Sequence, residues 1–267
     1  MPQQNDDGDD AERHAPSPAS VAPLCAQCGG AGWVRVAEIG AAGDWRVELA
    51  PCACQRERRS QAQWRRALDA SDMTPELLAK TFMDYDPSPD PSCVVGRDAA
   101  LAWAEETPDA RLLAPSWLML YGSTGTGKTH LLAAAFNLLM ASGHYPLYTL
   151  VPALLDYVRQ GLNASDGGGE YAARFQAVQQ APILILDDLG AEMRTPWTDE
   201  TLFKLLDYRY RRGLPTAVAS NLIPAHLEPR IASRLQDRAL AVALLMSGPD
   251  YRLAPPLAGG NQRRAAR

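Results

Sequence analysis

The chain has 267 residues, of which 46% are hydrophobic and 21% charged, and its formal net charge is −5. This length suits one α/β core with a small accessory module, because domains most often have ~100 to 150 residues. The longest apolar runs, such as "LLAAAF" and "ALAVALLM", are far shorter than the ~18 residues of a membrane span, and no signal-peptide pattern opens the sequence, so we expect a cytoplasmic protein without membrane contact.

The first part of the chain combines a polar tail with a cysteine-bearing segment. Residues 1–23 are rich in Asp, Pro, Ser and Ala and are predicted to be a disordered tail. Residues 24–55 contain two alternating stretches, "WVRV" and "WRVEL", around "GAAGD", a pattern typical of a β-hairpin. A C-x-x-C pair and a C-x-C pair flank this hairpin, and their four thiols are those of Cys25, Cys28, Cys52 and Cys54.

The spacing of these cysteines predicts a zinc-binding module. Four thiolates suit tetrahedral Zn²⁺, and so short a hairpin buries too little apolar surface to fold without a metal. Disulfides are the main alternative, although an intracellular chain lies in a reducing compartment. A thioredoxin-like redox role requires C-x-x-C at a strand-to-helix junction, whereas "CAQCGG" precedes a predicted strand. The fifth cysteine, Cys93, stands apart and is interpreted as a bystander.

Residues 56–92 are predicted to form a helical linker. "TPELL" offers Thr74 as an N-cap and Pro75 in the first turn of a helix, and "DYDPSPDPSC" predicts a proline-rich connection to the core. Arginines cluster just after the second cysteine pair, and we interpret them as a solvated helix face. They are Arg56, Arg58, Arg59, Arg65 and Arg66.

Residues 93–253 alternate apolar strands with amphipathic helices. The predicted strands are "WLMLY", "PLYTL", "ILILDD", "TAVAS" and "ALAVALL", with helices from Lys128, in "ALLDYVRQ", from Tyr171, after Thr195 and in "PRIASRLQD". Continuous apolar strands separated by helices indicate a parallel sheet covered on both faces, which is a three-layer α/β fold. The segment "GLNASDGGGEYA" is expected to be a loose insert and residues 254–267 a flexible tail.

A phosphate-binding loop lies between the first core strand and its helix. "GSTGTGKT" matches G-x-x-x-x-G-K-[ST] in full, and its glycines let backbone N–H groups point at phosphate oxygens beside the positive end of the helix. In this pattern Lys128 bridges the β- and γ-phosphates and Thr129 binds Mg²⁺. The nucleotide-binding residues are therefore predicted to be Gly122, Ser123, Thr124, Gly125, Thr126, Gly127, Lys128 and Thr129.

Polar residues end two further core strands. Asp187 and Asp188 follow "ILIL", where Asp187 would hold Mg²⁺ beside the phosphate loop. Asp188 stands where many ATPases of this architecture have Glu to orient the attacking water, and its shorter side chain predicts slow hydrolysis. Asn221 ends "TAVAS" and is a candidate nucleotide sensor, although a turn Asn before "LIP" is the simpler interpretation.

Two helices carry candidate contacts whose interpretation stays open. Arg230 and Arg234 lie four residues apart on one helical face, where they could reach a neighbouring subunit's nucleotide or could simply be solvated. In "VPALLDYVRQG", Tyr157 could stack on a base and Arg159 could pair with a phosphate. The spacing of Leu154, Leu155 and Val158 requires only an ordinary amphipathic helix.

Taken in order, several motifs resemble one family. "ELLAKTFMDYD", "YGSTGTGKTHL", "ILILDDLGAEM", "ASNL", "RIASRLQD" and the terminal "DYR" are similar to the DnaC/DnaI-type replicative helicase loaders of the AAA+ class, which are close to the IstB transposition ATPases. The resemblance covers about residues 24–252. It implies an AAA+ P-loop core, without an evident helical lid after "DYR", preceded by a helicase-gripping module.

The resemblance also implies roles for individual residues. Lys128 and Thr129 would bind ATP and Mg²⁺, and Asp187 would belong to the Mg²⁺ site. Asp188 would be the catalytic acid. Asn221 would be the first sensor, Arg252 the second sensor and Arg234 the arginine finger, with Arg230 as a competitor.

The function implied is that of an ATP-dependent loader. Such a protein binds a hexameric DnaB-type replicative helicase, delivers it onto single-stranded DNA, self-associates through its ATPase domain and hydrolyses ATP slowly unless a partner or DNA stimulates it. An IstB-like helper of a transposase is one alternative, although members of that family usually lack a cysteine module. A P-loop small-molecule kinase is another, but it needs an acceptor pocket and an arginine-rich lid, and neither is apparent.

Overall fold

The protein divides into two compact units, Met1–Arg59 and Ser60–Arg267. The structure, a computed structural model, describes residues 25–28, 31, 33–41, 44–106, 116–163 and 168–253. The tails predicted over residues 1–23 and 254–267 lie outside these described residues. Within the described ranges, no helix has both the length and the apolar character needed to cross a membrane.

The first unit contains the predicted hairpin. Strands β1 (Trp33–Ala41) and β2 (Asp44–Pro51) pair antiparallel, with Trp33 opposite Pro51 at the open end. This register brings Cys52 and Cys54 next to the turn that contains Cys25 and Cys28. Helix α1 (Ala53–Asp69) begins directly after Cys52, so the expected boundary between module and linker falls inside a helix.

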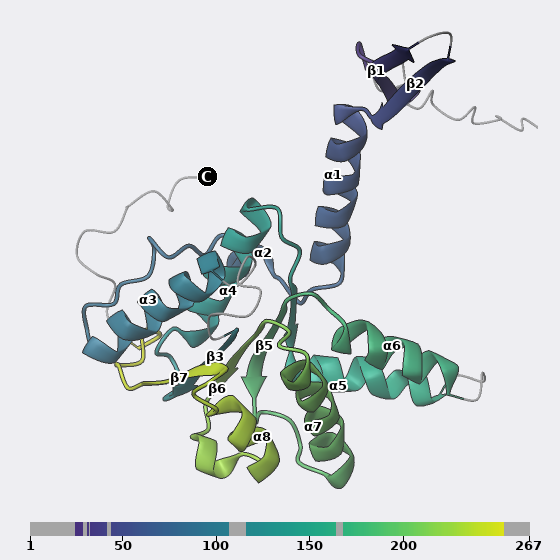
Figure 1. Ribbon diagram of the computed structural model, residues 1–267. Helices are drawn as coiled ribbons and strands as arrows, with labels where there is room; N and C mark the ends of the chain where they lie inside the picture. The colour runs from purple at the N-terminus through teal and green to yellow at the C-terminus, as the bar shows by residue number, and fades with distance from the viewer. Residues whose placement is uncertain are drawn as a thin grey trace, which may run out of the picture. The chain divides into compact units, whose positions relative to one another are not determined.

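The second unit is an α/β sandwich around a five-stranded sheet (Figure 1). All strand pairs of this sheet are parallel, and their order is β4-β5-β6-β3-β7. The strands are β3 (Trp117–Gly122), β4 (Leu147–Leu150), β5 (Leu184–Leu189), β6 (Thr216–Ser220) and β7 (Ala241–Met246). The helices are α2 (Pro75–Leu78), α3 (Pro91–Glu106), α4 (Lys128–Ala141), α5 (Val151–Gln160), α6 (Gly169–Gln179), α7 (Pro196–Arg211) and α8 (Pro229–Leu235), with short 3₁₀ helices η1 (Gly161–Asn163) and η2 (Pro224–His226).

Helices cover both faces of this sheet, which confirms the predicted α/β class. Successive side chains of a strand point to opposite faces, and along β3 Leu118 and Leu120 join one buried cluster whereas Trp117 and Met119 join the other. The first cluster is completed by α3 and α4, and the second by α5, α7 and α8 (Figure 1). Parallel strands bring their carboxyl ends to one edge of the sheet, where the loops that follow them can form a site.

Two local expectations need correction. Helix α3 starts at Pro91, inside the stretch expected to be a proline-rich linker, because the Asp90 carboxylate accepts the Ser92 N–H (2.8 Å) and Pro91 suits a first helical turn. The insert expected to be loose is helical at both ends, since η1 follows α5 directly and α6 begins at Gly169. Its middle, residues 164–167, lies outside the described part of the chain.

The linker is attached to the outer edge of strand β4. The N–H of Asp72 donates to the carbonyl of Tyr148 (2.9 Å), and the N–H of Tyr148 donates to Ser71 Oγ (3.1 Å). The Asp72 carboxylate also accepts the Thr149 hydroxyl (2.8 Å) and the Leu150 N–H (3.0 Å). An edge strand exposes unpaired backbone groups, and here the chain that follows α1 satisfies several of them.

Candidate active site

The phosphate loop adopts the turn that its glycines predict. Gly125 (φ 75°) and Gly127 (φ 88°) are both in the left-handed region, which glycine adopts without steric cost. Gly127 is also tightly packed, because a Cβ there would lie 2.4 Å from the Tyr85 ring. The loop ends where helix α4 begins, so unpaired N–H groups and the positive end of the helix dipole face the same space.

Lys128 is buried, with 5% of its surface exposed, and lies folded against its own loop. Its Nζ donates to the carbonyls of Gly122 (2.9 Å) and Ser123 (2.6 Å). Burial lowers the pKa of Lys128, while the carboxylates of Asp187 and Asp188 act in the opposite direction. Phosphate oxygens would offer this ammonium group charged acceptors in place of carbonyls, which strengthens the hydrogen bonds.

Asp187 is almost fully buried and has donors on both carboxylate oxygens. Tyr148 on the neighbouring strand donates its hydroxyl to Oδ2 (2.6 Å), and the N–H of Asp188 donates to Oδ1 (2.9 Å). Burial raises the pKa of Asp187, whereas hydrogen bonds with Tyr148 and Thr129 lower it. The carboxylate is thus held next to Thr129, the last residue of the phosphate loop.

Asp188 and Asn221 meet at the carboxyl ends of β5 and β6. Asn221 Nδ2 donates to Asp188 Oδ1 (3.3 Å), and both side chains line the same cavity as Lys128. Asp188 has a φ of 56°, and it is the only residue other than glycine with a positive φ among those that the structure describes. This conformation coincides with an irregularity in the pairing of β5 and β6 between Leu186 and Leu189. Such backbone strain is typical of functional sites.

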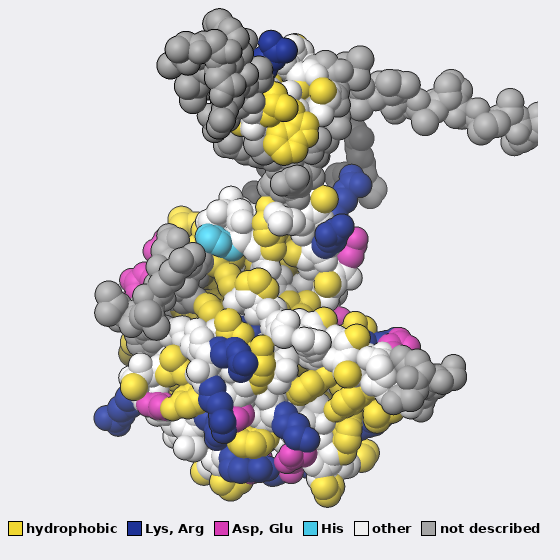
Figure 2. All heavy atoms as spheres, turned by 45° about the vertical axis from the view of Figure 1, so that its right-hand side comes forward, with side chains coloured by type: hydrophobic (Ala, Val, Ile, Leu, Met, Phe, Trp, Pro, Cys, Tyr) yellow, Lys and Arg dark blue, Asp and Glu magenta, His cyan; other side chains and the backbone are white. Residues whose placement is uncertain are grey.

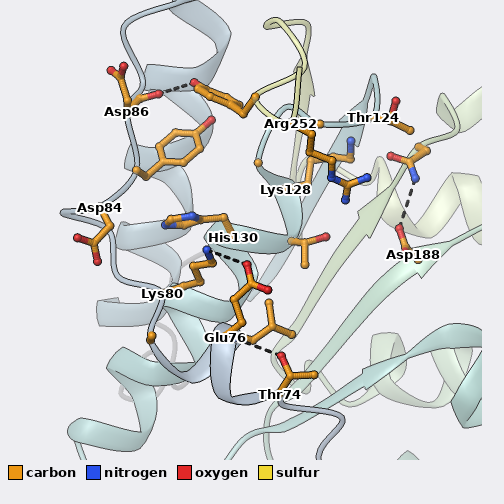
Figure 3. A pocket seen from close by; sticks show the side chains of 18 of the residues that line it. Thr74, Glu76, Lys80, Asp84, Asp86, Thr124, Lys128, His130, Asp188 and Arg252 are labelled. Carbon is orange, nitrogen blue, oxygen red and sulfur yellow. Dashed lines mark hydrogen bonds and ion pairs between the residues drawn. The ribbon is translucent and has the colours of Figure 1, made fainter. Parts of the chain in front are cut away.

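The cavity has a volume of about 1250 Å³ and lies over the phosphate loop (Figure 3). On one side the loop residues lie beside Asp188 and Asn221, and Arg252 approaches Lys128. The opposite wall is formed by residues of the segment 74–86, among them Glu76 and Lys80, together with His130 of α4 (Figure 3). The space is large enough for a nucleoside triphosphate.

Three residues that the sequence did not single out hydrogen-bond to the loop or to the opposite wall of the cavity, two through their side chains and one through its backbone. The Tyr85 hydroxyl donates to the Thr126 carbonyl (2.9 Å), and the Tyr251 N–H donates to the Gly125 carbonyl (3.0 Å). His130 Nε2 donates to the Thr81 carbonyl (2.8 Å). Each of these residues lies inside or beside a quoted motif, namely "DYD", "DYR" and "GKTH", but nothing in the letters indicates which partner it contacts.

The residues at the loop fit a magnesium ion. Mg²⁺ prefers oxygen ligands and retains most of its water, and the Thr129 hydroxyl and the Asp187 carboxylate are adjacent oxygen groups beside the phosphate loop. These two residues would hold the ion together with nucleotide phosphates. When bound, Mg²⁺ would neutralise phosphate charge.

The two candidate finger arginines lie elsewhere, on α8. Arg234 donates to Asp207 on α7 and to the carbonyl of Arg230 (2.8 Å), and its guanidinium lies 4.7 Å from the Phe203 ring centre. Arg230 pairs with Glu228 (2.7 Å) and is more exposed. Neither lines the cavity of its own chain. Lys and Arg side chains are interspersed with hydrophobic ones over the lower core, where α7 and α8 lie (Figure 2).

The cysteines of the first unit form one compact cluster. Their four Sγ atoms lie within 4.8 Å of one another, with Cys25 and Cys52 separated by 3.8 Å and Cys28 and Cys54 by 3.5 Å. Tetrahedral zinc with Zn–S bonds of ~2.3 Å requires S···S separations of about 3.8 Å, so the arrangement fits this ion. Hydrogen bonding to Cys28 and burial raise the pKa of Cys54 to about 12, and a bound cation would offset that tendency.

The remaining cysteine does not join this cluster. Cys93 is buried in α3 as part of the core of the second unit, where its sulfur packs near Gly248.

Fold and site together define a P-loop ATP-binding protein, and comparison with known proteins specifies the family. The family model of IstB-like ATP-binding proteins matches residues 48–247, so the chain belongs to that family.

Individual known proteins are also similar to the chain in sequence or in structure. The replicative helicase loader DnaI of Bacillus subtilis is 30% identical over 224 residues, which are 82% of this chain and 69% of the relative. An insertion-sequence ATP-binding protein of Sinorhizobium fredii is 31% identical over 53% of this chain and 60% of its own length. Among solved structures, a crystal structure of DnaI superposes with a TM-score of 0.53 at 29% identity, covering 69% of this chain and 98% of that one.

Proposed function

We propose that this protein is an ATP-dependent loader that binds a DnaB-type replicative helicase and delivers it onto single-stranded DNA. The observation that carries the proposal is the similarity to a replicative helicase loader, which covers 82% of this chain and therefore extends beyond the ATPase core at residues 93–253. A likeness confined to the phosphate loop would support only nucleotide binding. The proposed core is residues 93–253, with 24–55 as the zinc-binding module and 56–92 as the linker.

In this proposal the cavity holds ATP with Mg²⁺. Lys128 contacts the phosphates, Thr129 and Asp187 hold the ion, and Asp188 orients the attacking water as a general base. The hydrogen bond between Asn221 and Asp188 supports a sensor role for Asn221. Loss of the γ-phosphate on hydrolysis would change the surroundings of both side chains together. The position of Arg252 in the cavity near Lys128 supports its role as second sensor.

The arginine finger is proposed to act between subunits. Arg234 lies outside its own cavity, which suits a residue that completes the site of a neighbouring copy and therefore implies self-association through the ATPase core. Its bonds to Asp207 hold the side chain in one orientation. Arg230 stays the competitor because its side chain is 49% exposed, against 21% for Arg234.

The outer face of α5 is the proposed contact surface for single-stranded DNA. Leu154, Leu155 and Val158 are buried, so this amphipathic helix presents Tyr157 and Arg159 to the surface. The Arg174 guanidinium lies 4.7 Å from the Tyr157 ring centre, and that of Arg159 lies 4.5 Å from the ring centre of Trp197. The Tyr157 ring is exposed and the Trp197 ring is half-buried, and cationic groups beside accessible aromatic rings suit phosphates and unpaired bases.

The second candidate is an ATPase that assists a transposase. It is favoured by the insertion-sequence ATP-binding relative, whose similarity covers 53% of this chain. In that case the partner would be a transposase, and the cysteine cluster of the first unit would need another role.

Size exclusion with light scattering separates the two candidates. The full chain, purified with zinc, is mixed with the replicative helicase of its own host, with ATP, with ADP or without nucleotide. We expect a complex that contains both proteins and that the double variant Trp33→Ala/Leu49→Ala weakens, since both side chains are more than half exposed on the cysteine-bearing unit. Absence of co-elution under all three conditions would exclude the loader, whereas co-elution with a transposase would favour the alternative.

A further inference from the structure

We propose that Tyr148 is a positioning residue for the magnesium site, which it serves by orienting the Asp187 carboxylate through its hydroxyl. The inference rests on the nucleotide site of the proposed function, but it does not depend on a helicase partner. It concerns a residue in the middle of "LYTL", outside every phosphate-binding motif of the sequence.

The contact between Tyr148 and Asp187 is short and fully enclosed. The hydroxyl donates to Asp187 Oδ2 at 2.6 Å, and the two residues are 0% and 1% exposed. The other oxygen, Oδ1, already accepts the Asp188 N–H at 2.9 Å. With a donor on each oxygen, rotation of the carboxylate would break a buried hydrogen bond. These two hydrogen bonds fix the plane of the carboxylate, so the lone pairs of Asp187 that they do not use are available to Thr129 and to an ion beside it.

Tyr148 is itself held through its backbone and through its ring. Its backbone N–H and carbonyl both bond to the Ser71–Asp72 segment, at 3.1 and 2.9 Å. Its ring packs edge-on against Phe136 of α4, with 6.1 Å between the ring centres. Helix α4 starts at the phosphate loop, so the Tyr148 ring packs against the helix that follows this loop, while its hydroxyl contacts Asp187 on β5. These contacts fix the position of the Tyr148 hydroxyl, which in turn orients the Asp187 carboxylate.

This arrangement predicts a specific defect in metal binding. Groups that hydrogen-bond a metal ligand typically affect metal affinity or activity by ~10- to 100-fold when they are removed. Without the Tyr148 hydroxyl, Asp187 Oδ2 would be buried without this donor and the carboxylate could turn. Contacts of the phosphates with Lys128 and with the loop backbone would be unaffected, because Tyr148 does not line the cavity.

The test is Tyr148→Phe, which removes one oxygen and keeps the ring. A fluorescent ATP analogue is titrated into the full chain in EDTA and at increasing Mg²⁺ concentrations. We expect metal-free affinity within about twofold of wild type, and a Mg²⁺ concentration for half-maximal tightening that rises by ~10-fold or more. Replacement of Tyr148 by para-aminophenylalanine, which restores a donor, should bring the Mg²⁺ dependence back toward wild type.

Tyr210→Phe is the matched control. Tyr210 also donates its hydroxyl to a carboxylate, that of Asp237, but outside the nucleotide cavity. It should leave the Mg²⁺ dependence unchanged. A Tyr148→Phe protein with the wild-type Mg²⁺ dependence would overturn the inference while leaving the ATP site standing. A wild-type chain that binds no nucleotide would overturn both.

A second measurement covers the case in which Tyr148→Phe does not fold. The ¹³Cζ resonance of Tyr148 reports the hydrogen bond of its hydroxyl in the wild-type protein. We expect this resonance to shift when Mg²⁺ is added to nucleotide-loaded protein, while the Tyr210 resonance stays in place. A stationary Tyr148 resonance would contradict the inference.

Discussion

Asp188 combines catalytic position with an unfavourable backbone. Its φ of 56° is rare for residues other than glycine, and it lies within the irregular register between Leu186 and Leu189. The carboxylate reaches the cavity and is contacted by Asn221. This combination suits a residue placed to orient a water molecule near a phosphate.

The substitution Asp188→Asn tests this role without disturbing the turn. Asn tolerates the left-handed region better than most residues and has nearly the same shape, but it cannot accept a proton. We expect ATP affinity within a few-fold of wild type and turnover reduced by ~10²- to 10⁴-fold, measured as phosphate release. Retained turnover would assign the general base to another residue. Asp188→Gly is the control for the backbone, because glycine adopts the positive φ without strain; we expect it to be as stable as the wild-type protein.

Arg234 and Arg230 can be separated by single substitutions. If Arg234 is the finger, Arg234→Ala should keep ATP binding and lose partner- or DNA-stimulated hydrolysis by ~10³-fold or more, since it removes a cation from the neighbouring site. Arg230→Ala is the paired control, because its ion pairs are exposed and contribute little to stability. The opposite pattern, with only Arg230→Ala impaired, would assign the finger to Arg230.

At the scale of elements, the sheet depends on a buried arginine in α7. Arg209 is 0% exposed and donates to Thr216 Oγ1 (2.9 Å) and to the carbonyls of Ala181 (2.7 Å) and Pro215 (2.6 Å). Burial lowers the pKa of Arg209 to about 9. The bonded carbonyls precede β5 and β6, whose opposite ends carry Asp187 and Ser220.

Replacing this arginine should therefore destabilise the whole core. Arg209→Met fills most of the volume but removes the guanidinium donors from a group of buried acceptors, and a buried polar group that is left without a partner costs about 1 to 3 kcal/mol. We expect the free energy of unfolding to fall by roughly 3 kcal/mol or more in urea denaturation. Arg212→Met, on an exposed side chain next to it, should change this free energy by less than about 0.5 kcal/mol. Equal stability of the two variants would refute the structural role of Arg209.

The elements were largely predictable from the letters, because each has a local signal. Apolar runs located all five core strands, Thr74 was the predicted N-cap of α2, a helix was predicted after Thr195, and "GAAGD" located the hairpin turn. Helix α3 was not expected, because the prolines around Asp90 indicate both a linker and a helix start.

Site residues were predictable where they belong to a recognisable motif. The phosphate loop and the strand-end residues Asp187, Asp188 and Asn221 follow from their positions in the sequence, and the structure brings them together. The bond between Tyr148 and Asp187 depends on the register of two strands separated by α5 and α6. The burial of Arg209 is likewise set by packing, since a lone arginine in a helix is more often solvated.

At the scale of the whole molecule, the two units have different means of stabilisation. The second unit has a large apolar core on both faces of its sheet. In the part that the structure describes, the first unit has one hairpin, four cysteines and the start of α1, and a two-stranded hairpin alone is marginal in water. Its stability should therefore come from the metal.

Metal analysis tests this dependence. Protein purified under reducing conditions should contain ~1 zinc ion per chain, and Cys28→Ser should lose it, because three thiolates bind the ion less tightly than four. Cys93→Ala should retain the zinc, since Cys93 lies in the other unit. The core should still melt cooperatively after chelation. A wild-type protein without zinc, or with disulfides between these cysteines, would contradict the assignment.

In the proposed function, ATP bound at Lys128 serves to place a helicase on DNA, and a loading assay on circular single-stranded DNA measures this placement. A circle has no end onto which a hexameric ring could thread, so the ring must be opened or held by another protein. With the host helicase, ATP and the full chain, we predict helicase retained on the washed circles. Lys128→Ala, which should keep its fold but lose nucleotide binding, should leave them bare. Equal retention with wild type, with Lys128→Ala and without the protein would contradict the proposed function.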